Sequence, residues 1–182
     1  MTASWEEITE PGRQSSKMSR KTKKIILVLL VLILAVQFIR SFRYTGQSCC
    51  GIPGNRVDVH APSSMVLLRC GLPDQRSLVG NSQILCYTYQ NAELFGRSAE
   101  ISYYISKFRV YWIRVTFQNQ KDAQGLYQTA VESIGEHYQK LKGYRTLETD
   151  DGVILGTDGP PEVNADLSVI GDTLMIDVTY QK

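Results

Sequence analysis

The sequence predicts an α+β fold: a single N-terminal transmembrane helix, followed by a domain of mostly antiparallel strands with two helices on one face. Three observations predict it: an apolar run between basic residues, alternating polar and apolar residues at 99–118, and an apolar stripe of helical period at 121–142. Alternation is typical of a strand with one buried face. Apolar residues that recur every three or four positions are typical of a helix packed on a core.

The first predicted element is a transmembrane signal anchor at residues 25–43. Its apolar part, Ile25 to Ile39, is fifteen residues long, with Gln37 as its one polar residue. A helix of that length rises about 22 Å against a hydrocarbon core of roughly 30 Å, so the flanking lysines and arginines must extend towards the interfaces. Bulky and charged residues follow the run where a signal peptidase needs small ones, which favours an uncleaved anchor.

The charge distribution predicts the orientation of the chain. Residues 1–50 carry eight Lys and Arg against three Glu, whereas residues 51–182 carry twelve against fifteen Asp and Glu. Because basic residues stay on the cytoplasmic side, we expect a disordered cytoplasmic tail at 1–24 and an exported C-terminal part, periplasmic or extracellular, on the cell (inner) membrane. The exported part has no surplus of basic residues to neutralise phosphates, which argues against a nucleic-acid partner.

Four cysteines follow the apolar run, at Cys49, Cys50, Cys70 and Cys86. They show neither a C-x-x-C motif nor the spacing of zinc ligands, so no metal or cofactor is expected. An even number of cysteines in an exported segment favours disulfide bonds. Two pairings remain open. Either Cys70 bonds to Cys86, which leaves the adjacent pair for each other or for a partner chain, or both adjacent cysteines bond to Cys70 and Cys86.

The exported domain is expected at 63–182, after a linker at 44–62 that Gly and Pro interrupt repeatedly. A short helix should begin with Ser63 or Ser64 as its N-cap and end at Gly71. The expected strands are RSLVG, QILCYTYQ, AEISYYISKF and RVYWIRVTFQ, and after a second helix YRTLET, GVILGT, ADLSVI and DTLMIDVTYQ. In RVYWIRVTFQ one face is consistently apolar and should be buried: Tyr111, Ile113, Val115 and Phe117.

The second helix is predicted over 121–142. Asn119 or Asp122 suits its N-cap, and Gly143 should end it. Its apolar stripe, which is expected to pack on the sheet, consists of Tyr127, Ala130, Val131, Ile134, Tyr138 and Leu141.

Two stretches of the exported part are similar to each other and suggest repeats at 63–119 and 120–182. In the first, AEIS at residue 99 precedes IRVTFQ at residue 113, and in the second ADLS at residue 165 precedes IDVTYQ at residue 176. Each pair follows one of the predicted helices, so two helix-plus-meander units would result. The alternative is that any two amphipathic hairpins share alternation and β-branched residues.

The residues around the first helix end resemble a known element. Cys70, Gly71, Pro73 and Asp74 are followed by Tyr87 and Tyr89, which together resemble the helix, Gly-x-Pro-(Asp) turn and aromatic strand of SmpA/OmlA-type lipoproteins and related periplasmic proteins. The similarity covers about 25 residues of the chain. It implies a bacterial envelope location and a protein-contact role without catalysis. The chain departs from that family in having no lipobox.

The function expected from these features is that of a non-catalytic interaction or assembly module, anchored in the membrane and contacting an envelope protein. Trp112, Tyr103 and Tyr111 are the candidates for its interaction surface, because aromatic residues are enriched at protein contacts. The alternative is a ligand-binding or sensor domain. A thiol-dependent enzyme is the third hypothesis, and no local motif around the cysteines favours it.

Overall fold

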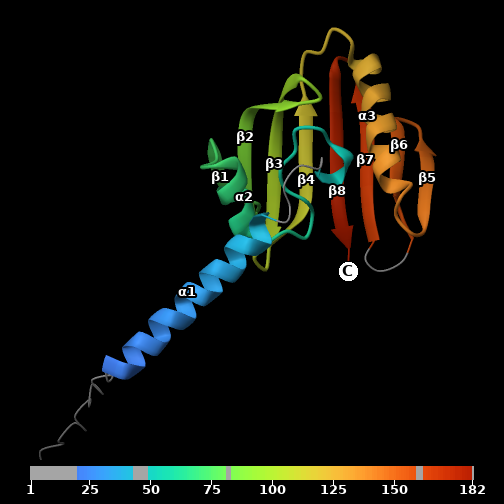
Figure 1. Ribbon diagram of the computed structural model, residues 1–182. Helices are drawn as coiled ribbons and strands as arrows, with labels where there is room; N and C mark the ends of the chain where they lie inside the picture. The colour runs from blue at the N-terminus through green and yellow to red at the C-terminus, as the bar shows by residue number, and fades with distance from the viewer. Residues whose placement is uncertain (1–19, 43–48, 81–82, 159–161, 182) are drawn as a thin grey trace, which may run out of the picture. The chain divides into compact units, whose positions relative to one another are not determined.

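The computed structural model describes residues 20–42, 49–80, 83–158 and 162–181 (Figure 1). The chain divides into two compact units, Met1–Thr45 and Gly46–Lys182. The first contains α1 (Arg20–Phe42), in which Ile25 to Leu34 expose their apolar side chains.

The predicted transmembrane anchor at 25–43 is wrong. Of the helices in the described part of the chain, none is both long enough and apolar enough to cross a membrane. The apolar side chains that the structure describes in α1, at 25–34, cover about 15 Å of helix against roughly 30 Å of hydrocarbon, and the side chains of 35–42 lie outside the described residues. Residues 20–24, predicted as part of a disordered tail, belong to α1, and residues 1–19 lie outside the described residues.

The second unit contains one sheet of eight strands in the order β1-β2-β3-β4-β8-β7-β6-β5. All of its strand pairs are antiparallel, and the pairing of β4 with β8 joins two consecutive helix-plus-four-strand segments. The first segment comprises α2 (Ser63–Cys70), β1 (Gln75–Leu78), β2 (Leu85–Leu94), β3 (Arg97–Ser106) and β4 (Arg109–Phe117). The second comprises α3 (Ala123–Tyr138), β5 (Tyr144–Thr149), β6 (Gly152–Thr157), β7 (Glu162–Ile170) and β8 (Thr173–Gln181).

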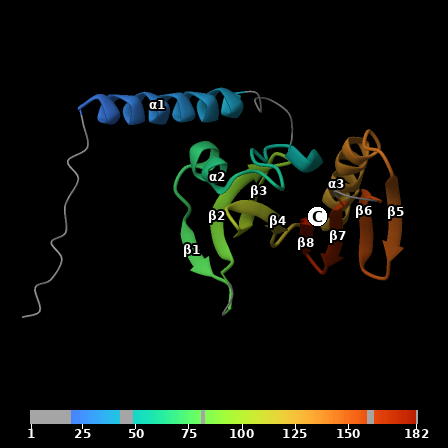
Figure 2. The same cartoon turned by 90° about the horizontal axis from the view of Figure 1, so that it is seen from below.

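The helices and the segment before α2 lie on one face of this sheet. Figures 1 and 2 show α2, α3 and residues 49–62 on the same side. The buried side chains of the strands form one cluster with those of these segments. Within the described residues of the second unit, no helix covers the opposite face (Figure 2). We call this opposite face the open face.

Residues 49–62, the described part of the segment predicted as a linker at 44–62, contribute to the core. Ile52 and Val57 are 0% and 1% exposed, and the segment includes the short helix η1 (Cys49–Gly51). Gly51, with φ of 72°, packs so closely on α3 that an added Cβ would lie 2.8 Å from the Ile134 Cα. The Ser133 hydroxyl donates a hydrogen bond of 2.9 Å to the Gly51 carbonyl. Its glycines therefore permit close packing here rather than marking a connection between domains.

The inward face of β4 is as predicted at three of its four positions. Ile113, Val115 and Phe117 are all 0% exposed. A register shift between Tyr104 and Ile105 of β3 leaves Tyr111 without a paired residue, and Val110 takes the inward position with 0% exposure. An extra residue in one strand moves the following side chains to the other face, so Tyr111 joins the open face.

The boundaries of α2 and α3 agree with the prediction only in part. The side chain of Asp122 caps α3 by accepting a hydrogen bond of 3.0 Å from the Gly125 N–H, as predicted. However, α3 ends at Tyr138, and Gly143 instead occupies a left-handed turn before β5. Pro62 precedes α2 in place of the serine cap that was predicted, without a side-chain hydrogen bond.

Candidate functional site

The predicted interaction surface is divided between the two faces of the sheet. Tyr103 is 1% exposed and belongs to the core under the helices, whereas Tyr111 and Trp112 are half-buried on the open face. The neighbour that the sequence analysis missed is Tyr104, which pairs with Trp112 across β3 and β4. Alternation in β3 was the signal for it, because consecutive tyrosines must point to opposite faces of a strand.

A cluster of aromatic and charged side chains occupies the middle of the open face. We call Tyr104, Trp112, Arg114 and Asp177 the Trp112 cluster. The Tyr104 and Trp112 rings are stacked with centroids 4.0 Å apart, and the Arg114 Cζ lies 4.5 Å from the Trp112 ring centroid. Arg114 donates two hydrogen bonds of 2.8 and 2.9 Å to the Asp177 carboxylate, which also accepts one of 2.7 Å from the Trp112 indole. Each side chain thus holds another in place.

The electrostatics of the cluster follow from these contacts. The hydrogen bonds with Asp177 raise the pKa of the Arg114 guanidinium, because they favour its charged form. Asp166 lies directly opposite Asp177 in the register of β7 and β8. Burial, and then the charge of Asp177, raise the pKa of the Asp166 carboxyl.

A hollow of about 370 Å³ adjoins the Trp112 cluster on the open face. Arg145, which lines it, forms salt bridges with Glu162 at 2.8 Å and with Asp158 at 3.2 Å. The described residues provide no hydrogen-bonded or salt-bridged partner for Asp166. We call this the sheet-face hollow; its lining is Trp112, Arg145, Leu147, Ile154, Asn164, Asp166, Asp177 and Thr179.

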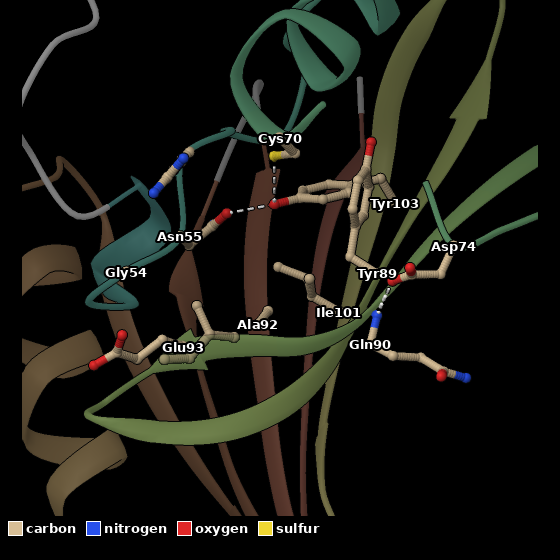
Figure 3. Close-up of a pocket in the computed structure, with 12 residues that line it drawn as sticks. Gly54, Asn55, Cys70, Asp74, Tyr89, Gln90, Ala92, Glu93, Ile101 and Tyr103 are labelled. Carbon is tan, nitrogen blue, oxygen red and sulfur yellow. Dashed lines mark hydrogen bonds between the residues drawn. The ribbon is translucent and has the colours of Figure 1, made fainter. Parts of the chain in front are cut away.

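A second cavity, of about 250 Å³, lies under α2 on the helix-covered side of the sheet (Figure 3). The Tyr103 hydroxyl donates to Asn55 Oδ1 at 2.9 Å and lies 3.7 Å from the Cys70 thiol, which donates to it. In Figure 3 the Tyr89 ring lies beside that of Tyr103. This cavity is therefore built around a short chain of hydrogen bonds.

Several of the residues that carry the predicted resemblance to SmpA/OmlA-type lipoproteins have identifiable structural roles at this cavity. The Tyr89 hydroxyl donates to the Gly71 carbonyl at 2.9 Å, and the Asp74 carboxylate accepts a 2.7 Å hydrogen bond from the Gln90 N–H. Both contacts attach the turn after α2 to β2. The cysteine, glycine, aspartate and second tyrosine of the element are thus explained as a fixed helix-turn-strand connection.

Burial raises the pKa of two groups that line this cavity, the Tyr89 phenol and the Cys70 thiol. It raises the pKa of Tyr89 to about 12. It also raises the pKa of the Cys70 thiol, an effect that the hydrogen bond with Tyr103 and the charges of Arg56 and Arg69 reduce but do not reverse. At neutral pH Cys70 is consequently a protonated thiol, the less nucleophilic form.

The structure does not form the predicted disulfide bonds at the cysteines whose side chains it describes. No disulfide bond joins any two of Cys50, Cys70 and Cys86. Cys70 lines the cavity under α2, whereas Cys86 pairs with Tyr104 on the open face, so the sheet separates the two sulfur atoms. Cys50 donates to Asp58 at 2.8 Å, and Cys86 lies 3.6 Å from the Thr88 hydroxyl. The side chain of Cys49 lies outside the described residues.

No group of three or more His, Cys, Asp or Glu side chains in the described part of the chain is placed to hold a metal ion. The open face instead offers aromatic rings and paired charges, and the α2 cavity offers hydroxyl and amide groups. Comparison with family models, curated proteins and solved structures finds no match to this chain.

Proposed function

We propose that the second unit is a non-catalytic protein-interaction or assembly module and that it binds its partner through the open face. The Trp112 cluster carries this proposal. Trp, Tyr and Arg are the residues that contribute most to binding energy at protein interfaces, and here one of each is half-buried on a face that no described helix of the unit covers.

The rigidity of the cluster supports the same function. Trp112 is held by the stacked Tyr104 ring and by its hydrogen bond to Asp177, so its side chain has little rotamer freedom left to lose on binding. Immobilising a flexible side chain at an interface costs about 0.5–1.5 kcal/mol, which a preorganised one avoids. A protonated, partly buried Cys70 gives no comparable support to the thiol-dependent enzyme.

Photo-crosslinking from the open face tests the proposal. A benzophenone amino acid in place of Tyr111 should give a discrete protein adduct in the native cell, because this side chain lies next to Trp112. Trp112→Ala in the same chain should abolish that adduct. The control carries the probe in place of Tyr127, which is half-buried on α3 on the covered side of the sheet. Equal adducts from both positions, or an adduct insensitive to Trp112→Ala, would contradict an interface on the open face.

The cavity under α2 favours a second candidate function, a ligand-binding or sensor domain. Its 250 Å³ and its hydroxyl and amide groups suit a small polar molecule. Such a ligand should raise the midpoint of thermal unfolding in proportion to the logarithm of its concentration, and Asn55→Leu should remove that rise. A rise that Asn55→Leu leaves unchanged would place the ligand elsewhere.

The envelope location and exported orientation stay predictions, as does the resemblance to SmpA/OmlA-type proteins. An enzymatic reporter that is active only outside the cytoplasm, fused after the last residue, tests the location. Activity of a cytoplasmic reporter at the same position would contradict it.

A further inference from the structure

Of the charged side chains that line the sheet-face hollow, some form ion pairs and one does not. Asp177 is neutralised by Arg114, and Arg145 by its two acidic partners. Asp166 is the one carboxylate of the lining without a basic partner among the described residues. A cation that entered the hollow would therefore meet an acceptor that no other group occupies.

The remaining surfaces of the hollow are apolar or accept hydrogen bonds. Leu147 is 57% exposed and lies beside Ile154 in the register of β5 and β6, and Ile154 in turn pairs with Asp166. The buried Oδ1 of Asn164 accepts no hydrogen bond from the described residues. The uncommitted polar groups are thus a carboxylate, an amide oxygen and the Thr179 hydroxyl, next to an aliphatic wall.

The open face already holds one guanidinium by the same chemistry. The Arg114 guanidinium lies over the Trp112 ring and donates two hydrogen bonds to the Asp177 carboxylate. Asp166 lies directly opposite that carboxylate, one strand farther along the sheet, and Trp112 also lines the hollow. Arginine suits such a place because its planar fork matches a carboxylate and its face stacks on aromatic rings.

We propose that the sheet-face hollow receives a basic side chain of the protein partner, with its cationic group on Asp166 and its aliphatic stem along Leu147 and Ile154. This inference rests on the proposed function and specifies the chemistry of the partner. A divalent metal ion is a poorer occupant, because it needs several oxygen ligands and Asp177 is engaged by Arg114. An anionic group would face Asp166 across the hollow.

Binding of a blocked arginine tests the inference directly. The full chain carries Trp5→Phe, so that Trp112 is its one indole, and the Trp112 indole N–H signal is followed by nuclear magnetic resonance. N-acetylarginine amide should shift this signal saturably. N-acetylcitrulline amide, which has the same shape without the charge, should bind about tenfold more weakly, since a charged hydrogen bond is lost.

Two variants and a control identify the acceptor. Asp166→Asn should remove the preference for arginine over citrulline. Asp172→Asn, at the exposed β7–β8 turn outside the hollow, should leave it unchanged. Ile154→Lys provides an internal cation opposite Asp166 and should abolish arginine binding even if the asparagine variant folds poorly.

Equal binding of arginine and citrulline, or an unchanged preference in Asp166→Asn, would overturn the inference. So would arginine binding that persists in folded Ile154→Lys. These failures are distinct from failure of the proposed function, because the crosslink from position 111 and its dependence on Trp112 do not involve Asp166.

Discussion

Tyr138 carries a buried hydroxyl whose ionisation is expected to affect stability. Its side chain is 1% exposed and its hydroxyl has no hydrogen-bond partner among the described residues. Burial, with the charges of Cys50 and Asp58 as smaller contributions, raises the pKa of this phenol. The folded protein therefore retains the proton at a pH at which the unfolded chain releases it.

We expect the free energy of unfolding to fall as the pH rises above about 10, the ordinary pKa of tyrosine. A tyrosine whose pKa is raised in the folded state contributes its full stabilisation below that pH. If the folded state keeps the proton throughout, the free energy of unfolding falls by about 1.4 kcal/mol by pH 11. Tyr138→Phe should reduce this loss, measured by urea denaturation at pH 9 and pH 11. At pH 7 it should leave stability unchanged or raised, since an unpaired buried hydroxyl is removed.

An alkaline loss that Tyr138→Phe does not change would refute the assignment of this pH dependence to Tyr138.

At the scale of elements, alternation and helical period predicted most of what the structure contains. The inward residues of β4 and the Asp122 cap of α3 follow from local rules that a single segment obeys. Local rules could not place Tyr111, because the bulge that turns it outward depends on pairing with β3. They also failed at 44–62, where glycines and prolines suggested a linker although Ile52 and Val57 are buried.

The contact between η1 and α3 should make substitution of Gly51 costly. Gly51→Ala should destabilise the protein by more than Gly96→Ala, which has a similar φ of 68° but no atom within 4 Å of an added Cβ. Left-handed backbone costs alanine about 1–2 kcal/mol at both positions. Overpacking against α3 should add about 1–3 kcal/mol at Gly51 alone. Urea denaturation measures both, and equal losses would show that this contact relaxes without cost.

At the scale of the whole molecule, the pairing of β4 with β8 unites the two helix-plus-strand segments into one sheet. The sequence suggested the similar halves, but it could not show that their last strands pair, because the paired residues lie 57 to 67 positions apart in the chain. The candidate site could not be predicted from the sequence for the same reason. Trp112 and Asp177 become neighbours only through this pairing, so composition indicated the aromatic residues and not the carboxylates.

Exchange of the ion pair across this junction tests how much it contributes. Arg114→Asp should destabilise the protein by about 1–2 kcal/mol, a value limited by partial solvent exposure, because two carboxylates would then face each other. Asp177→Arg should do the same with two guanidinium groups. The double exchange should recover at least half of the loss in urea denaturation. Additive losses would indicate that the pair contributes no coupling energy.

The position of this ion pair has a consequence for which strand edge each half can pair with. Arg114 and Asp177 are the second residues of the two similar segments IRVTFQ and IDVTYQ, and they stand directly opposite each other. A local dyad therefore passes between them, as it would in a dimer of identical halves. In such a dimer this residue would meet its own copy and, if charged, be repelled. Opposite charges on the axis require two halves that differ at this position, as they do here, so the junction favours pairing with the other half of the chain over pairing with a second copy of the same half.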